Sequence, residues 1–110
     1  MANKYINKAF DLNSTGAITI YTVPAETVAI VKAVQAYNDT ASAVTVTMSF
    51  TDASASTTYN IGYATSSTVQ QFSLLSDSLL VLEESDILKL TASVGTQVTG
   101  VASILEQDRT

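Results

Sequence analysis

The segment that most constrains the fold is Val44–Thr51, in which apolar and hydroxyl-bearing residues alternate. The apolar positions are Val44, Val46, Met48 and Phe50, and threonine or serine stands between them. Because successive side chains of a strand point to opposite faces, this period of two predicts a half-buried β-strand. One apolar and one polar face are typical of an antiparallel sheet that has one face in water.

Other short apolar segments, separated by turn-forming residues, are also predicted to be strands. Pro24 has no amide proton for a sheet ladder, so it ends the first of them. Short strands at near-regular spacing predict an all-β fold, an antiparallel β-sandwich or jelly roll, and 110 residues suit a single domain, 1–110. The predicted strands are 17–23, 58–64, 68–75, 79–82, 87–92 and 97–105, and the predicted turns are 13–16, 38–42, 52–56, 76–78 and 93–96.

The segment 25–38 fits two interpretations. A helical stripe of apolar residues can be drawn along it, and Pro24 could open a helix. Its β-branched residues lose rotamer freedom on a helix, which favours a strand. Both faces of that strand would be fairly apolar, apart from Lys32, so we expect a central strand covered on both sides.

The N-terminal segment 1–12 mixes apolar and charged residues. It is predicted to be an edge strand of this domain, with an arm that adds to a neighbour's sheet as the second choice. Its lysines, Lys4 and Lys8, are candidates for contact with an acidic partner, and Tyr5 lies between them. We find no apolar run of the length of a secretion signal or a membrane span, so no membrane partner is expected.

Composition argues against several classes of function. The chain has no histidine and no cysteine, which removes the usual general base and the usual zinc ligands. We therefore expect no enzyme activity, no metal site and no cofactor. Ten acidic residues against five basic ones give a net charge of −5, which disfavours nucleic-acid binding.

The most acidic stretch contains Glu83, Glu84 and Asp86 between two apolar runs. A calcium site would require six to eight oxygen ligands, more than three carboxylates on such a loop provide. A hydrolytic carboxylate pair would require a cleft that raises one pKa. We interpret the stretch instead as a charged hairpin loop that keeps the adjoining strands from sticking to other sheets.

Tyr59 and Tyr63 are predicted to share one strand face with Ile61. Two tyrosines on one face could stack on sugar rings, which makes a carbohydrate-binding module an alternative function. Such residues more often pack in a core or an interface. We therefore place Tyr59 and Tyr63 with Lys4, Tyr5 and Lys8 as candidate partner-contact residues.

Several segments of the sequence resemble small β-sandwich virion proteins of tailed bacteriophages. They are Val23–Lys32, Tyr37–Asn38 with the Thr/Val strand after it, Leu79–Leu88 and Ser103–Glu106. The resemblance spans about residues 17 to 106. It departs from the pattern at Ser85, near which a glycine would be expected.

The resemblance implies a virion structural protein, most simply a capsid decoration or cement protein with no catalytic residues. Its partners would be the major capsid protein and copies of itself, in a dimer or trimer on the capsid surface, after synthesis in the host cytoplasm. A neck, tail or fibre component is the alternative in the same class. A face rich in serine and threonine suits docking, because hydroxyls bind partners without the desolvation cost of charges.

Overall fold

The computed structural model describes residues 3–12, 15–39, 42–75, 79–93 and 98–108. Four of the predicted turns, at 13–16, 38–42, 76–78 and 93–96, lie wholly or partly outside these ranges. No helix long and apolar enough to cross a membrane occurs within them. The described strands are β1 (Asn3–Leu12), β2 (Ile18–Thr22), β3 (Thr27–Asn38), β4 (Val44–Asp52), β5 (Thr57–Ser66), β6 (Gln70–Leu75), β7 (Leu80–Leu82), β8 (Ile87–Ala92) and β9 (Val98–Asp108).

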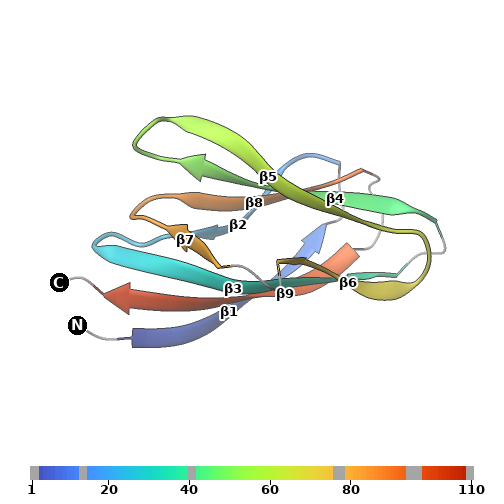
Figure 1. The fold of residues 1–110 in the computed structure, drawn as a ribbon, viewed down its shortest axis with the longest axis horizontal. Helices are drawn as coiled ribbons and strands as arrows, with labels where there is room; N and C mark the ends of the chain where they lie inside the picture. The colour runs from blue at the N-terminus through green and yellow to red at the C-terminus, as the bar shows by residue number, and fades with distance from the viewer. Residues whose placement is uncertain (1–2, 13–14, 40–41, 76–78, 94–97, 109–110) are drawn as a thin grey trace.

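The strands form two antiparallel sheets packed face to face, so the predicted all-β sandwich is confirmed (Figure 1). Sheet A has the order β1-β9-β3-β6, with β7 also paired to β3, and sheet B has the order β2-β8-β4-β5. In Figure 1, sheet B lies above and sheet A below. The molecule measures 47 × 27 × 21 Å along its principal axes.

The alternation in the sequence produces the core directly. On β4, Val44, Val46 and Met48 point inward and are buried, while the threonines between them point outward and stay partly exposed. On β8, Leu88 and Leu90 are fully buried opposite β4. Burying side chains of this size contributes roughly 1.5–3 kcal/mol each, which makes the shared interior the main source of stability.

The segment 25–38 contains β3, a strand, and the helical interpretation is wrong. β9 lies on one side of β3, and β6 and β7 lie on the other. Lys32 is the extra residue of a β-bulge against β9, so the alternation changes phase there. Ala29 and Val31 are buried before the bulge and Val34 and Ala36 after it. The opposite face of β3 is only partly covered, contrary to the expectation of cover on both sides.

Candidate interaction surfaces

The acidic segment 83–86 connects the two sheets. β7 belongs to sheet A and β8 to sheet B, so the hairpin predicted across this segment is wrong. Each flanking apolar run pairs with strands distant in the sequence, and the segment forms an arch between layers. Glu83 and Glu84 are exposed, whereas Asp86 is only 4% exposed.

The carboxylate of Asp86 joins two loops. Its Oδ1 accepts a hydrogen bond from the backbone N–H of Ala53 at 3.0 Å, and its Oδ2 accepts one from the N–H of Glu83 at 3.0 Å. Ala53 lies in the turn between β4 and β5, so the side chain ties this turn to the arch. Buried carboxylates require such partners, because desolvating an unpaired charge is costly.

The backbone of the arch completes this connection. The N–H of Val23 donates to the carbonyl of Asp86 at 3.0 Å, and the N–H of Ser85 donates to the carbonyl of Val23 at 3.1 Å. Ser85 has a φ of 71°, the left-handed region that favours glycine, which accounts for the expected glycine near this position. No group of three or more His, Cys, Asp or Glu residues within the described ranges could hold a metal ion. The acidic stretch is structural in this geometry.

A second buried polar group lies at the opposite end of β3. Asn38 is fully buried, and its Nδ2 donates to the carbonyls of Ser42 at 3.0 Å and Thr68 at 3.1 Å. The hydroxyl of Ser66 also donates to the carbonyl of Thr68 at 2.8 Å. Both ends of the sandwich are thus held by a buried side chain that hydrogen-bonds neighbouring loops.

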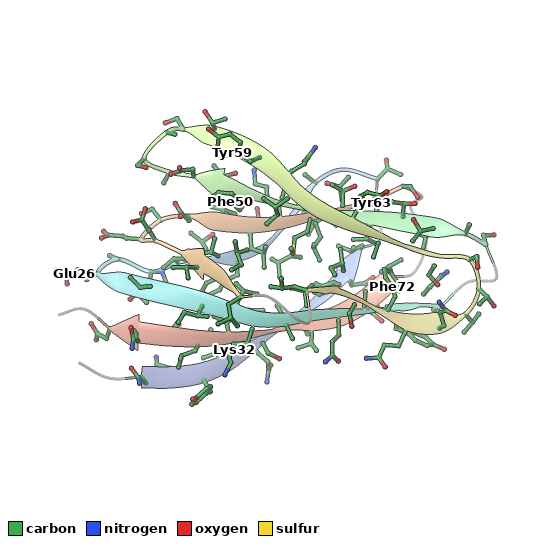
Figure 2. All side chains as sticks on the ribbon, in the orientation of Figure 1. Glu26, Lys32, Phe50, Tyr59, Tyr63 and Phe72 are labelled. Atoms are coloured by element: carbon green, nitrogen blue, oxygen red, sulfur yellow. The ribbon has the colours of Figure 1, made fainter. Side chains whose placement is uncertain are left out.

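The two tyrosines of β5 do not form one platform. Tyr59 is paired with Phe50 and Tyr63 with Thr47, and these partners are three residues apart on β4, so they face opposite sides. Ile61 is the unpaired residue at the β-bulge that changes the phase. The predicted shared face is therefore wrong. Tyr59 packs against the Phe50 ring at 5.8 Å between centroids, whereas Tyr63 is 74% exposed on the outer face (Figure 2).

The N-terminal candidates lie along β1, which is an edge strand of sheet A. Tyr5 points outward and is 75% exposed, and the ammonium of Lys32 lies 5.8 Å from its ring centroid. This distance is within the range of a cation–π contact. Lys4 and Lys8 occupy the alternate positions of β1, and both are exposed.

One contact between the sheets was not found from the sequence. The buried Tyr21 of β2 donates its phenolic hydrogen to Oε2 of Glu106 on β9. Burial, with the hydrogen bond to Glu106 and its negative charge, raises the pKa of Tyr21 above its ordinary value. The sequence shows a single tyrosine among the isoleucines and threonines of this strand, which does not reveal its partner.

Two shallow hollows occur among the described residues. The larger, about 210 Å³, is lined mainly by outward-facing residues of sheet A, including Gln35, Tyr37 and Gln71. The smaller, about 160 Å³, lies between Lys4, Glu106 and neighbouring residues. Pockets that enclose small molecules usually measure ~300–1,000 Å³. The exposed faces of the sheets are therefore the stronger candidates for function.

The outer face of sheet A carries an apolar row across four strands. The register places Tyr5 of β1, Leu105 of β9, Ile30 of β3 and Val81 of β7 side by side. Tyr5 and Val81 are exposed, and Leu105 and Ile30 are half-buried. Only Tyr5 was anticipated as a contact residue, because the row depends on pairings between distant segments.

The outer face of sheet B carries hydroxyls along its strand β4. The outward positions there are Thr45, Thr47 and Thr51, which are partly exposed, and Ser49, which is buried. Tyr63, Ile87 and Lys89 stand beside them on the neighbouring strands. Across the strands, Thr45 and Thr65 are hydrogen-bonded at 3.0 Å between hydroxyl oxygens, and Thr51 and Thr58 at 2.7 Å. These four threonine hydroxyls have partners within the face.

Comparison with known proteins identifies the fold. No protein-family model and no curated protein matches the chain. The chain is similar to a protein of Bacillus endospore appendages, which form a family of disulfide-linked pili, with a TM-score of 0.52 and 11% identity over 96% of this chain and 84% of that one. A second similar structure is that of PirA, with a TM-score of 0.41 and 9% identity over 92% of this chain and 93% of that one. At 11% identity, the similarity to the appendage protein establishes a shared β-sandwich architecture.

Proposed function

We infer that the chain is a structural subunit of a protein assembly, and specifically a virion decoration protein that binds the major capsid protein. The observation that carries this proposal is that apolar side chains are exposed in two separate places. One is the apolar row of sheet A, and the other is the β5 edge of sheet B, with Tyr63 at 74% exposure and Ile61 at 38%. Extended apolar patches on soluble proteins usually mark interaction sites.

Two surfaces suit a subunit that bridges neighbours. On a repeating lattice, many weak contacts add to a strong attachment without any single tight site. The resemblance to tailed-phage virion proteins, carried by segments such as Val23–Lys32 and Leu79–Leu88, supports a capsid as that lattice. The buried polar side chains Asp86 and Asn38 support a structural role, because both hydrogen-bond loops rather than face a cleft.

A filament subunit is the second candidate. The fold shared with the Bacillus endospore appendage protein favours it, because the similarity covers nearly the whole chain. That family is described as disulfide-linked, whereas these 110 residues contain no cysteine. A filament of this chain would therefore be held by non-covalent contacts, and reducing agents would not dissolve it.

Binding to phage heads tests the proposal. Purified protein is mixed with heads of its own phage that lack it, and the sedimented fraction is measured together with the temperature at which the heads rupture. Co-sedimentation in hundreds of copies with a higher rupture temperature supports decoration. A few to a dozen copies per particle would indicate the neck or tail, and filaments in electron micrographs would favour the second candidate. Absence from every particle would refute a virion role.

Tyr63→Ala tests the β5 edge in the same assay. Because Tyr63 is exposed and packs little within the chain, its loss should leave the fold intact and weaken head binding by about tenfold or more, as expected for a central aromatic contact. Asn60→Ala, another exposed position on β5, is the matched control and should bind normally. Equal binding by both variants would place the capsid contact elsewhere. Retention of the wild type on polysaccharide columns, lost in Tyr63→Ala, would favour a carbohydrate-binding module.

A further inference from the structure

The larger of the two hollows lies on the outer face of sheet A, apart from the apolar row. It measures about 210 Å³, and its polar side chains come from β3 (Gln35 and Tyr37), β6 (Gln71) and β9 (Thr99). In Figure 1 this face is the underside of the lower layer, toward the end where β6 is labelled. Along β3 the hollow begins ~15 Å beyond Ile30 of the apolar row, so the two are separate surfaces.

The strand register explains why polar side chains gather at this hollow. Asp11 of β1, Thr99 of β9, Tyr37 of β3 and Gln71 of β6 are partners in one row across sheet A. All four point outward, because the positions between them face the core, as the buried Ala36 does on β3. An aromatic ring, a hydroxyl, an amide and a carboxylate therefore stand side by side on an open sheet face.

Two glutamine side chains form a hydrogen-bonded pair at the hollow. Nε2 of Gln71 donates to Oε1 of Gln35 at 3.2 Å. Oε1 of Gln71 remains as an acceptor and Nε2 of Gln35 as a donor, and neither bonds another of the described residues. A donor and an acceptor held next to each other suit a ligand rich in hydroxyls, because each hydroxyl both donates and accepts.

The ring of Tyr37 supplies the apolar part of the hollow. Its side chain is 41% exposed, so part of the ring is open to a ligand. A tyrosine combines an apolar ring, against which the C–H groups of a sugar can pack, with a polar hydroxyl. No charged side chain is among the described residues that line the hollow, and the row ends in the carboxylate of Asp11. An anionic ligand would therefore find no cation here, which favours a neutral one.

We propose that this hollow, centred on Tyr37, binds one neutral sugar ring of a glycan chain. Tyr37 packs against the C–H groups of the ring, and the glutamine pair hydrogen-bonds its hydroxyls. The open shape suits a unit within a longer chain, because pockets that enclose a small molecule are larger, ~300–1,000 Å³. The inference goes beyond the proposed function and does not use the surfaces assigned to assembly. On a particle that displays many copies, weak single contacts would add to firm attachment to a glycan-covered surface.

Titration of isotope-labelled protein, followed by NMR, tests the site. The neutral probes are hexasaccharides of glucose, galactose, mannose and N-acetylglucosamine, and hexagalacturonate is the charged counterpart. At least one neutral probe should shift the amide signals of residues 35–37, 71 and 99–101. The dissociation constant should be about 1 mM, as expected for a small ligand on an open surface. The signals of the β5 edge and of the apolar row should stay in place.

Substitutions in the hollow separate the contributions of the ring and the amides. Tyr37→Ala should raise the dissociation constant by about tenfold or more, because the packing surface is lost. Tyr37→Phe keeps the ring and should lose only a few-fold, and Gln71→Ala, which breaks the amide pair, about fivefold. Tyr63→Ala is the matched control, because Tyr63 is an exposed tyrosine of the other sheet, and it should bind like the wild type. Circular dichroism and the melting temperature check that each variant is folded.

Three results would overturn the sugar site. Equal binding by Tyr37→Ala and the wild type would place the sugar contact elsewhere. Binding of hexagalacturonate without binding of a neutral probe would contradict the argument from charge. Absence of shifts with every probe would refute glycan binding at the hollow.

Head binding separates this inference from the proposed function. If Tyr37→Ala loses the sugar but still reaches phage heads, both stand. If the wild type binds a neutral glycan but no particle, the sugar site stands and the virion role fails. If no glycan binds the wild type and Tyr37→Ala fails to reach heads, the hollow is part of the capsid contact and the sugar site is wrong.

Discussion

The two outer faces of the sandwich have opposite chemistry although both belong to antiparallel sheets. On sheet B, outward threonines hydrogen-bond across strands, as Thr45 does with Thr65 and Thr51 with Thr58, and the exposed Tyr63 stands at the β5 edge. On sheet A the outward row from Tyr5 to Val81 is apolar, and the Lys32 ammonium over Tyr5 is its one described charged contact. The difference indicates which face gains from a partner. The expectation that a hydroxyl-rich face docks a partner stays a prediction.

The contrast between the two outer faces requires that each sheet keeps its strand register. A substitution at Gly100 should disturb that register most strongly. On β9, a Cβ at Gly100 would lie 2.0 Å from the backbone oxygen of Gln35 and 2.6 Å from Cζ of Phe10. Gly100→Ala should therefore force β9 away from β3 and cost about 4 kcal/mol of unfolding free energy, or prevent folding. Gly62→Ala in sheet B has no heavy atom within 4 Å of the new Cβ and should change it by less than ~0.5 kcal/mol.

Urea unfolding of both alanine variants measures this difference. Two similar, small losses of stability would mean that β9 and β3 can separate without cost. The apolar row, which requires the β9–β3 register, could then not be a fixed surface. Insoluble expression of Gly100→Ala beside soluble Gly62→Ala would agree with the prediction.

The features found from the sequence are those set by local patterns. The alternation of Val44–Thr51 gave its strand and its buried face, because both depend on neighbouring residues only. The bulges at Lys32 and Ile61 were not visible, and a single inserted residue reverses every later side chain. For this reason Tyr59 and Tyr63 were assigned to one face.

Features that depend on pairing between distant segments were missed. The local pattern at 83–86 predicts a hairpin, because adjacent apolar runs often pair, and nothing local shows that β7 and β8 lie in different sheets. The apolar row combines residues from 5 to 105 and appears only when four strands are in register. The role of Asp86 likewise required the position of Ala53, 33 residues away.

A substitution at Asp86 tests how firmly the two sheets are held together. Its carboxylate hydrogen-bonds both the arch that leaves sheet A and a turn of sheet B. Asp86→Ala removes two charge-assisted acceptors and leaves two N–H groups without them, so it should cost about 3 kcal/mol of unfolding free energy. Glu84→Ala, exposed on the same arch, should change it by less than ~0.5 kcal/mol. Chemical denaturation measures both, and equal effects would show that charge on the arch matters rather than the buried contacts.

The hydrogen bond from Tyr21 to Glu106 is a weaker contact between the sheets, and it makes the stability depend on pH. Tyr21→Phe removes the hydrogen bond to Glu106 and should cost about 1 kcal/mol at neutral pH. The raised pKa means that Tyr21 keeps its proton in the folded chain where the unfolded chain begins to lose it, near pH 10. This contribution is therefore fully present below about pH 10 and is lost as the pH rises further.

The difference in stability between the wild type and Tyr21→Phe should accordingly shrink above pH 10. Urea unfolding at pH 8 and at a series of values up to 11 measures it. A difference that stays constant over this range would mean that Tyr21 ionises equally in both states. The contact between β2 and β9 would then add no pH dependence.

The smallest effect is expected on the hydroxyl face itself. Thr51→Val and Thr58→Val each keep a β-branched shape while removing one side of a 2.7 Å hydrogen bond between exposed hydroxyls. Each should change the unfolding free energy by less than ~0.5 kcal/mol, with a coupling of similar size in the double variant. The sedimentation coefficient should stay unchanged, because neither substitution touches the apolar row of sheet A. Association strengthened by these valines would show that apolar area on either sheet promotes it, and the contrast between the two faces would then be one of hydrophobicity only.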